Sequence, residues 1–376
     1  MNIDAIELFH LALPLRRPLP TPLGSFEVLE TVLVGMHGDG AVGWGEASPG
    51  NAPLIGAEWA AGAMAVLRDW IAPAVVGKSF SSGDDLSKCL GLIHGNQHAK
   101  TGVDVAWWDL NARLQNRPLH EILGGKKTNI VEVGPTFDRM DSIDALYTAV
   151  SEAVAAGFSR AKFKFRPGWD VSMVDFVRKE FPTLTIHIDC EGGLGLEHMD
   201  MLYRLEDFSL AMIEQPLPVD DLVGHAMVQD ALHTPICLDE SITTVGQAGM
   251  ALELNSCKFV NLKPGRVGGL TPAVAIHDLC HEHCVPCWVG ATPQSAVGGR
   301  IGFALAAKDN CTYPSDFFPS DRILAKDIAE PLLPVRNDAD GRQCVQLGSA
   351  PGIGIEPERT LLERFSIGRA KVAPAG

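Results

Sequence analysis

The feature that most constrains the fold is an alternation of short apolar runs and helical stretches between about residues 128 and 320. The runs are rich in β-branched and aromatic residues and are bounded by Pro, Gly or Ser, which is typical of buried strands. Eight such runs occur: NIVEVGPT, RAKFKF, LTIHID, LAMIEQPL, TPICLDES, CKFVNLKPG, VPCWVGAT and CTYPSDFF. Strands that alternate with helices pair in parallel, and successive units of one handedness close into a barrel. The sequence therefore predicts an α/β protein built around a TIM-type (β/α) barrel.

Five ionisable side chains stand at the ends of successive runs. They follow one another at steps of 25, 25, 25 and 24 residues, about the length of one strand–helix–loop unit: Lys164, Asp189, Glu214, Asp239 and Lys263. In a barrel the C-terminal ends of the strands gather at one mouth, where active sites are built. We therefore expect these side chains to converge on one active site.

The region before the barrel reads differently. Residues from about 3 to 50 look like antiparallel strands with a hairpin turn at Asp39-Gly40. Residues from about 57 to 123 look helical, with one apolar stripe formed by Ala99, Val103, Ala106, Leu110 and Leu114. We therefore expect an α+β portion that ends at Gly124-Gly125.

Composition narrows the classes of function. The chain has 376 residues and a net charge of −15, from 31 basic and 46 acidic side chains, which argues against binding to nucleic acids or anionic membranes. No apolar run reaches transmembrane length, and the start of the chain lacks the pattern of a secretory signal. Nine scattered cysteines indicate reduced thiols and a cytoplasmic protein. Barrels of this size often assemble, so we expect a homo-oligomer.

The three carboxylates predict a metal site. Asp189, Glu214 and Asp239 would lie at equivalent depth on adjacent strands, where three anions repel one another and raise one another's pKa. A divalent cation removes this repulsion, and carboxylate oxygens suit Mg²⁺, with Mn²⁺ as the alternative, better than Zn²⁺. Each carboxylate alone would serve equally well as a helix cap or in a surface ion pair. Three in phase favour the metal site.

The lysines predict proton transfer. Lys162 and Lys164 are two residues apart and therefore share one face of a strand, as do Asn261 and Lys263. We expect Lys162 to lower the pKa of Lys164 by like-charge repulsion and to help hold an anionic substrate. A lysine tuned in this way can act as a general base beside the metal ion. The combination predicts abstraction of a proton α to the carboxylate of a small-molecule substrate.

These residues resemble a known signature. Lys162-x-Lys164, Asp189, Glu214, Asp239 and Lys263 look like the signature of the muconate-lactonizing subgroup of the enolase superfamily. GAVGWGEASP and VDVAWWDLNARLQNRPLHEILGG resemble its capping domain and the helix that leads into the barrel. The resemblance implies an α+β capping domain over residues 1–125, a modified barrel over 126–330, and a segment over 331–376 that returns to the cap, with CVQLGSAPGIGIEPE as a short strand and loop.

Three stretches narrow the resemblance within the subgroup. KFKFRPGWD, VNLKPGRVGGL and YPSDFFPSDRILAKDI look like the family of o-succinylbenzoate synthases and N-succinylamino acid racemases. The resemblance implies a dehydration that yields an aromatic product in menaquinone synthesis, or racemisation of N-acylated amino acids, with Lys164 as the base in both. Lys263 would be the opposite base in racemisation and a cationic stabiliser of the enolate in dehydration. Muconate cycloisomerisation, dipeptide epimerisation, or a catalytically silent homologue that binds a carboxylate are the further alternatives.

Departures from the family pattern mark candidate substrate-binding positions. Glu191 stands where the pattern has Asn, which predicts either a fourth metal ligand or weaker substrate binding, and Gln294 stands where it has Glu. Asn261 shares a face with Lys263. Phe26, in the loop PTPLGSFE, and Ser320, after the eighth strand, are expected near the mouth.

Overall fold

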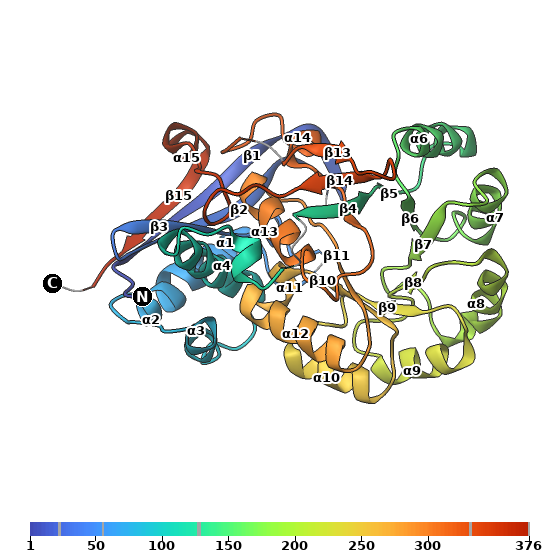
Figure 1. Ribbon diagram of the computed structural model, residues 1–376, viewed down its shortest axis with the longest axis horizontal. Coiled ribbons are helices and arrows are strands. Elements are labelled where there is room, and N and C mark those ends of the chain that lie inside the picture. The colour runs from blue at the N-terminus through green and yellow to red at the C-terminus, as the bar shows by residue number, and fades with distance from the viewer. Residues whose placement is uncertain (22–23, 55, 126–128, 331–332, 375–376) are drawn as a thin grey trace.

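The computed structural model describes residues 1–21, 24–54, 56–125, 129–330 and 333–374. Two regions stand side by side in Figure 1: an antiparallel sheet with its helices, which we call the cap, and a ring of parallel strands with helices outside it, which we call the barrel. The N-terminus lies at the cap (Figure 1). This arrangement confirms the predicted fold class.

The cap sheet has the strand order β15-β1-β2-β3 and is antiparallel throughout. Its strands are β1 (Ala5–Thr21), β2 (Gly24–Gly38), β3 (Ala41–Ala47) and β15 (Ser366–Val372). Asp39 and Gly40 turn the chain between β2 and β3 with φ of 48° and 81°, the left-handed values that such a hairpin requires. The predicted hairpin is therefore confirmed.

Helices cover one face of the cap sheet: α1 (Ala60–Val66), η1 (Leu67–Ile71), α2 (Ala72–Val75), α3 (Gly83–Leu90), α4 (Gln97–Leu114) and α5 (Leu119–Ile122). Helix α4 lies directly against β3, because a side chain at Gly43 or Gly45 would collide with the α4 backbone. The predicted apolar stripe of α4 is buried from Ala99 to Leu110, whereas Leu114 is 42% exposed at the end of the helix.

The barrel strands occupy the eight runs that the sequence predicts. They are β4 (Ile130–Gly134) with β5 (Thr136–Phe137), β6 (Arg160–Lys164), β7 (Thr185–Asp189), β8 (Ile213–Glu214), β9 (Ile236–Leu238), β10 (Phe259–Leu262), β11 (Cys287–Val289) and β12 (Ser315–Asp316). Strands β5 to β11 form one parallel sheet, and β12 pairs in parallel with β4. A bridge between Cys287 and Cys311 joins β11 to the segment before β12 and completes the ring.

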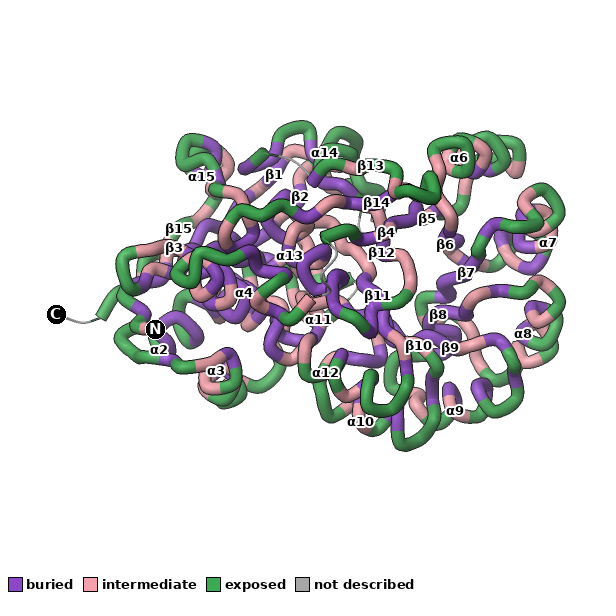
Figure 2. Tube along the Cα trace, in the orientation of Figure 1, coloured by how far each residue is buried: buried purple, intermediate pink, exposed green. Residues whose placement is uncertain are grey.

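The barrel helices surround this ring, and α6 to α10 follow its outer rim in Figure 1. These helices are α6 (Ile143–Ala155), α7 (Val171–Glu180), η2 (Leu196–His198), α8 (Met199–Leu205), η3 (Glu206–Phe208), α9 (Leu222–Ala231), α10 (Val245–Glu253), α11 (Pro264–Val267), α12 (Leu270–Glu282), α13 (Ala296–Ala306) and α14 (Ser320–Ile323). The last helix, α15 (Arg359–Phe365), packs against β1 of the cap. Figure 2 shows the strands mostly buried and the outer turns of these helices exposed, so the main core lies between strands and helices.

The path of the C-terminal segment differs in part from the prediction. CVQLGSAPGIGIEPE was expected to return to the cap as a strand and loop, but β14 (Gln343–Gln346) pairs antiparallel with β4 and forms a hairpin with β13 (Val335–Asn337). Strands β4 and β5 belong to different sheets, and β14 covers the edge of β4 that β12 leaves open. The following loop does reach the cap, where Glu356 accepts a hydrogen bond of 2.7 Å from Trp44 Nε1. The predicted boundaries near 126 and 331 fall on 126–128 and 331–332, outside the described residues.

Glu46 ties the cap to the barrel. Its carboxylate is buried and accepts hydrogen bonds from Thr31 Oγ1 on β2 at 2.9 Å, from the amide and hydroxyl of Ser295 at 3.0 and 2.6 Å, and from the Gly298 amide at 2.9 Å. Ser295 caps the N-terminus of α13, so one cap carboxylate holds the first turn of the helix that follows β11. Ser48 adds a hydrogen bond of 2.8 Å to the Pro293 carbonyl.

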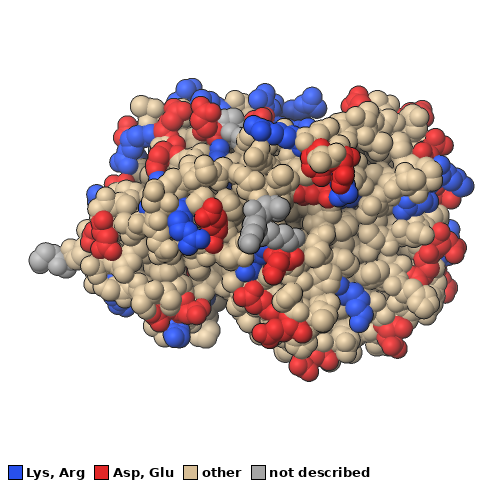
Figure 3. All heavy atoms as spheres, viewed as in Figure 1, with Lys and Arg blue, Asp and Glu red and all other residues tan. Residues whose placement is uncertain are grey.

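The surface in Figure 3 carries acidic and basic side chains scattered among uncharged ones. In the part of the chain that the structure describes, no helix has both the length and the apolar character needed to cross a membrane.

We expect Glu46→Ala to lower the free energy of unfolding by about 3–5 kcal/mol, because it leaves several buried donors without an acceptor. Glu46→Gln keeps the shape and part of the hydrogen bonding and should cost less.

Burial raises the pKa of Glu46 above its ordinary 4.5, so the folded state binds a proton more readily than the unfolded state. This carboxyl group therefore makes the wild type lose stability as the pH rises above about 4.5. Urea titrations at several pH values should show that part of the pH dependence missing in Glu46→Gln, and equal pH slopes in both proteins would contradict the assignment.

Candidate active site

Strand β6 delivers its two lysines to the inside of the barrel mouth. Ala161 and Phe163 point to the opposite face and are buried against the helices, where Phe163 stacks on Phe137 at 5.4 Å between ring centroids. Lys162 is 3% exposed and Lys164 lies nearer the opening. The period-two prediction for this strand is therefore confirmed.

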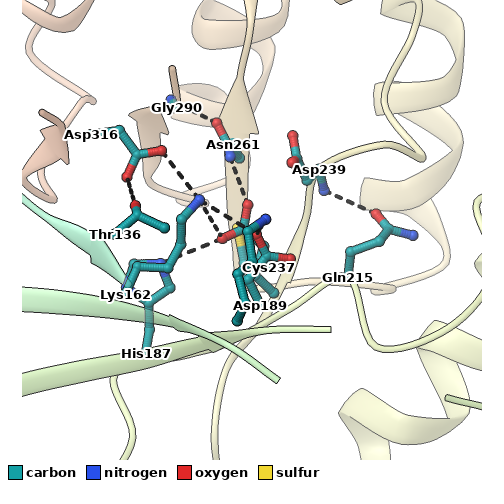
Figure 4. Close-up of polar contacts among 12 residues, drawn as sticks. Thr136, Lys162, His187, Asp189, Gln215, Cys237, Asp239, Asn261, Gly290 and Asp316 are labelled. Carbon is teal, nitrogen blue, oxygen red and sulfur yellow. Dashed lines mark hydrogen bonds and ion pairs between the residues drawn. The ribbon is translucent and has the colours of Figure 1, made fainter. Parts of the chain in front are cut away.

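Three carboxylates surround the Lys162 ammonium group (Figure 4). Its Nζ lies 3.4 Å from Asp189 Oδ2, 3.5 Å from Glu214 Oε2 and 3.1 Å from Asp316 Oδ2. Asp189 and Glu214 end the neighbouring strands β7 and β8 and are paired in register. The Lys162 side chain is thus a buried cation held by anions from three strands.

The other two lysines each bind one carboxylate at the mouth. Lys164 Nζ donates to Asp189 Oδ2 at 2.7 Å, and Lys263 Nζ donates to Asp239 Oδ2 at 2.6 Å. Because the strand order runs from β6 through β7, β8 and β9 to β10, these two lysines flank the three carboxylates from opposite sides. The structure therefore brings together all five residues of the spaced series, together with Lys162.

The carboxylates set the protonation of the lysines. Burial lowers the pKa of Lys164, and Lys162 lowers it further, but Asp189, Glu191 and Glu214 outweigh both effects and raise it. Lys162 therefore lowers the pKa of Lys164 as predicted, but the carboxylates, whose effect the sequence did not reveal, make the net shift upward. For Asp189 the balance runs the other way. Burial alone would raise its pKa, but the positive charges of Lys162 and Lys164 outweigh burial and hold the pKa of this carboxyl group below its usual value.

Glu214 behaves differently from the two aspartates. Burial raises its pKa, the negative charges of Asp189 and Asp239 raise it further, and Lys162 compensates only in part. Asp239 has a lowered pKa, because Arg266, Lys263 and Lys162 overcome the effect of burial. Glu214 is thus the carboxylate that lacks enough nearby positive charge to offset its burial.

This imbalance fits a divalent cation. Glu214 Oε2 is buried without a hydrogen-bond donor, and all three side chains offer the hard oxygen atoms that Mg²⁺ prefers. Among the described residues, no three acidic, His or Cys side chains are already gathered closely enough to hold an ion. Ligand atoms of Asp189 and Asp239 are engaged by Lys164 and Lys263, so an ion would have to replace these ammonium groups.

Asn261 is held at both ends of its amide. Nδ2 donates to Glu214 Oε1 at 2.7 Å, and Oδ1 accepts from the Gly290 amide at 2.8 Å (Figure 4). A side chain at Gly290 would come within 2.6 Å of this amide and 2.8 Å of Lys263 Cε, so only glycine leaves room there. Asn261 thus orients Glu214, and its role in substrate binding stays a prediction.

Asp316 and Arg160 belong to the site and were missed. Asp316 ends β12; it accepts a hydrogen bond of 3.0 Å from Thr136 Oγ1 and forms an ion pair of 2.9 Å with Arg160. Lys162 and Arg160 overcome the effect of burial and hold the pKa of Asp316 far below its usual value. The available signals were an aspartate at the end of the eighth run and an arginine two residues before Lys162.

Arg266 and Gln215 are further residues that the spacing did not reveal. Arg266 pairs with Asp239 and donates to the Asn261 carbonyl at 2.7 Å. Gln215 Oε1 accepts from the Asp239 amide at 3.0 Å (Figure 4). Gln215 and Glu191 adopt φ of 39° and 49°, left-handed values that are uncommon for non-glycine residues.

The remaining predicted positions are placed as follows. Glu191 follows β7 and binds Lys164 and Arg166. Gln294 is half-buried before α13 and packs over Gly298, where a side chain would collide with it. Phe26 lies on β2, paired with Leu19, and not in the expected loop, of which residues 22 and 23 are outside the described residues. Ser320 begins α14 and is buried. In the described chain, no polar or ring contact ties Phe26 or Ser320 to the cluster.

Comparison with known proteins identifies the family of the chain. Residues 5–124 match the mandelate racemase / muconate lactonizing enzyme N-terminal domain family, and residues 145–361 match the enolase C-terminal domain-like family. The chain is 37% identical to an o-succinylbenzoate synthase of Geobacillus stearothermophilus over 97% of this chain and 96% of that protein. It is 34% identical to an N-succinylamino acid racemase of Thermus thermophilus over 98% of each.

A solved structure agrees as well. An enolase superfamily member from Listeria innocua superposes with a TM-score of 0.92 at 28% identity and covers 99% of both chains. The family matches cover both regions of the chain, and its relatives are lyases and racemases. The chain is therefore an enzyme of the enolase superfamily and belongs to its mandelate racemase/muconate lactonizing enzyme family.

Proposed function

We propose that this protein is a Mg²⁺-dependent enzyme that abstracts the proton α to a substrate carboxylate, with Lys164 as the base. The observation that carries the proposal is the placement of Lys164 and Lys263 on opposite sides of Asp189, Glu214 and Asp239. An α-proton beside a carboxylate is very weakly acidic, so its removal needs a positioned base together with positive charge where the enolate forms.

Asp189, Glu214 and Asp239 would hold the metal ion, which when bound supplies the positive charge that stabilises the enolate. Occupation of Asp189 and Asp239 by an ion would release Lys164 and Lys263 from the ion pairs that engage them. A lysine released from its carboxylates and facing added positive charge loses its proton more easily, and can then accept one from substrate.

For the overall reaction we propose dehydration of the o-succinylbenzoate synthase type, as in menaquinone synthesis. Lys164 would take the α-proton, and Lys263 would remain protonated to stabilise the enolate as the hydroxyl group leaves. Support comes from the 37% identical synthase and from the cationic pair Lys263 and Arg266 on one side of the mouth.

Racemisation of N-succinylamino acids is the second candidate. Two lysines on opposite sides can remove the proton from one face of the α-carbon and return it to the other. The 34% identical racemase supports this reading. Muconate cycloisomerisation and dipeptide epimerisation use the same kind of enolate chemistry and come third.

A cytoplasmic location and a homo-oligomer also remain proposals. The location is supported by nine cysteines that are all free thiols.

We expect Lys164→Ala to lower dehydration of the cyclohexadiene precursor by at least about 10³-fold, because the base is lost. The ultraviolet change on formation of the aromatic product measures this reaction. Lys179→Ala, which removes a 70% exposed lysine, is the matched control and should keep wild-type rates. Dehydration at wild-type rate in Lys164→Ala would refute the assignment of the base.

The two lysines should separate by substrate enantiomer. In D₂O, Lys164→Ala should stop deuterium uptake from one enantiomer of an N-succinylamino acid and Lys263→Ala from the other, because each lysine faces one side of the α-carbon. Proton nuclear magnetic resonance follows the exchange. Equal loss for both enantiomers in both variants would argue against two opposed bases.

Mg²⁺ should stabilise the fold as well as support turnover. At about 100 times its dissociation constant the ion should add about 2.7 kcal/mol to the free energy of unfolding. Asp239→Asn and Glu214→Gln should lose most of this gain in thermal unfolding, whereas Glu152→Gln, an exposed control, should keep it. A wild type that unfolds identically with Mg²⁺ and with a chelator would contradict the metal site.

A further inference from the structure

The alternation that places Lys162 and Lys164 on one face continues to Arg166. The chain turns tightly just beyond β6, where the Arg166 amide donates to the Trp169 carbonyl at 3.1 Å and the Trp169 amide donates back at 2.8 Å. The buried Trp169 side chain anchors this turn in the core, and Gly168 takes φ of 74°, a left-handed value that allows the chain to turn tightly. Arg166 therefore starts from a fixed point at the rim of the mouth.

Glu191 bridges Arg166 to the base. One carboxylate oxygen accepts from Lys164 and the other forms an ion pair of 2.8 Å with Arg166 Nη2. The Glu191 amide in turn donates to Asp189 Oδ1 at 3.1 Å, which holds its left-handed backbone in place. The guanidinium group consequently lies one carboxylate beyond the Lys164 ammonium group, a separation of roughly 5–8 Å.

The Arg166 guanidinium has donors to spare. A guanidinium carries five N–H donors. Its other described partner is Asp138, 3.4 Å from Nε and 66% exposed, and the Arg166 side chain itself is 41% exposed. Both Glu191 oxygens, by contrast, are already engaged by cations. The pair therefore keeps unused N–H donors, partly open to solvent and next to the Lys164 ammonium group, and no carboxylate oxygen without a cation.

We propose that Arg166, positioned by Glu191, is a specificity-determining residue that binds a second, distal carboxylate of the substrate. This inference rests on the proposed function, in which Lys164 acts at the carbon next to the first carboxylate. A carboxylate at the far end of a four-carbon substituent on the substrate would reach the guanidinium group. A succinyl group is such a substituent. The site would then select dicarboxylates over monocarboxylates of the same shape.

Calorimetric binding tests the inference without turnover. o-Succinylbenzoate and 2-butanoylbenzoate share the aromatic carboxylate and the acyl chain, but only the first carries a distal carboxylate. With Mg²⁺ present, the wild type should prefer o-succinylbenzoate, and Arg166→Gln should reduce that preference roughly 10- to 100-fold, the usual worth of a hydrogen-bonded charge. Arg166→Lys should restore part of it, because a lysine keeps the charge without the fork.

Arg139→Gln is the matched control, because it removes an exposed arginine next to Asp138 and should leave the preference unchanged. Equal loss for both ligands in Arg166→Gln, or no loss for either, would overturn the proposal, as would a wild type without any preference. The same outcomes separate this inference from the proposed function. A preference that depends on Arg166 in a protein that neither dehydrates nor exchanges α-protons would support Arg166 and refute the activity. Turnover with an unchanged preference would do the reverse.

Discussion

The ammonium group of Lys162 is the charge on which the mouth of the barrel depends. It is buried, it lies over the Trp288 ring at 5.0 Å, and it faces carboxylates from β7, β8 and β12. A buried cation without such partners would be costly, and three buried carboxylates without the cation would repel one another. Neither the ammonium group nor the three carboxylates could be buried alone without a large free-energy cost. The parallel strands bring both together at their ends, where each offsets the burial cost of the other.

Around this centre the charges alternate in sign. Charged side chains form a continuous series of ion pairs in which each member pairs with the next: Arg160, Asp316, Lys162, Asp189, Lys164, Glu191 and Arg166. A second, shorter set joins Lys263 and Arg266 to Asp239. Because each charge is fixed by the next, a new ion or an anionic substrate cannot enter without changing several pairs at once.

The sequence predicted those parts of the site that depend on local pattern. Strand period placed Lys162 beside Lys164, and the constant step along the chain brought Asp189, Glu214 and Asp239 to one mouth. What it missed depends on contacts between distant segments. Asp316 reaches Lys162 only because β12 pairs with β4 and closes the ring, and no spacing within the series reports that closure. The lowering effect of Lys162 on the pKa of Lys164 was predicted, but the larger opposite effect of the carboxylates was not, because it depends on distances between side chains of different strands. The tail strand was misplaced because its pairing with β4 joins distant segments, and no local pattern in the sequence indicates that pairing.

The hydrogen bonds of Glu46 have a consequence for exchanging parts between related enzymes. The segment from Gly290 to Gln294 leads from barrel strand β11 to the first turn of α13, whose donors are satisfied by a cap residue. A chimaera that took residues 1–125 from another chain would therefore also replace the acceptor that fixes this part of the catalytic mouth. A functional exchange between such enzymes is therefore expected to require that the cap and the seventh barrel unit, β11 with α13, are taken from the same protein.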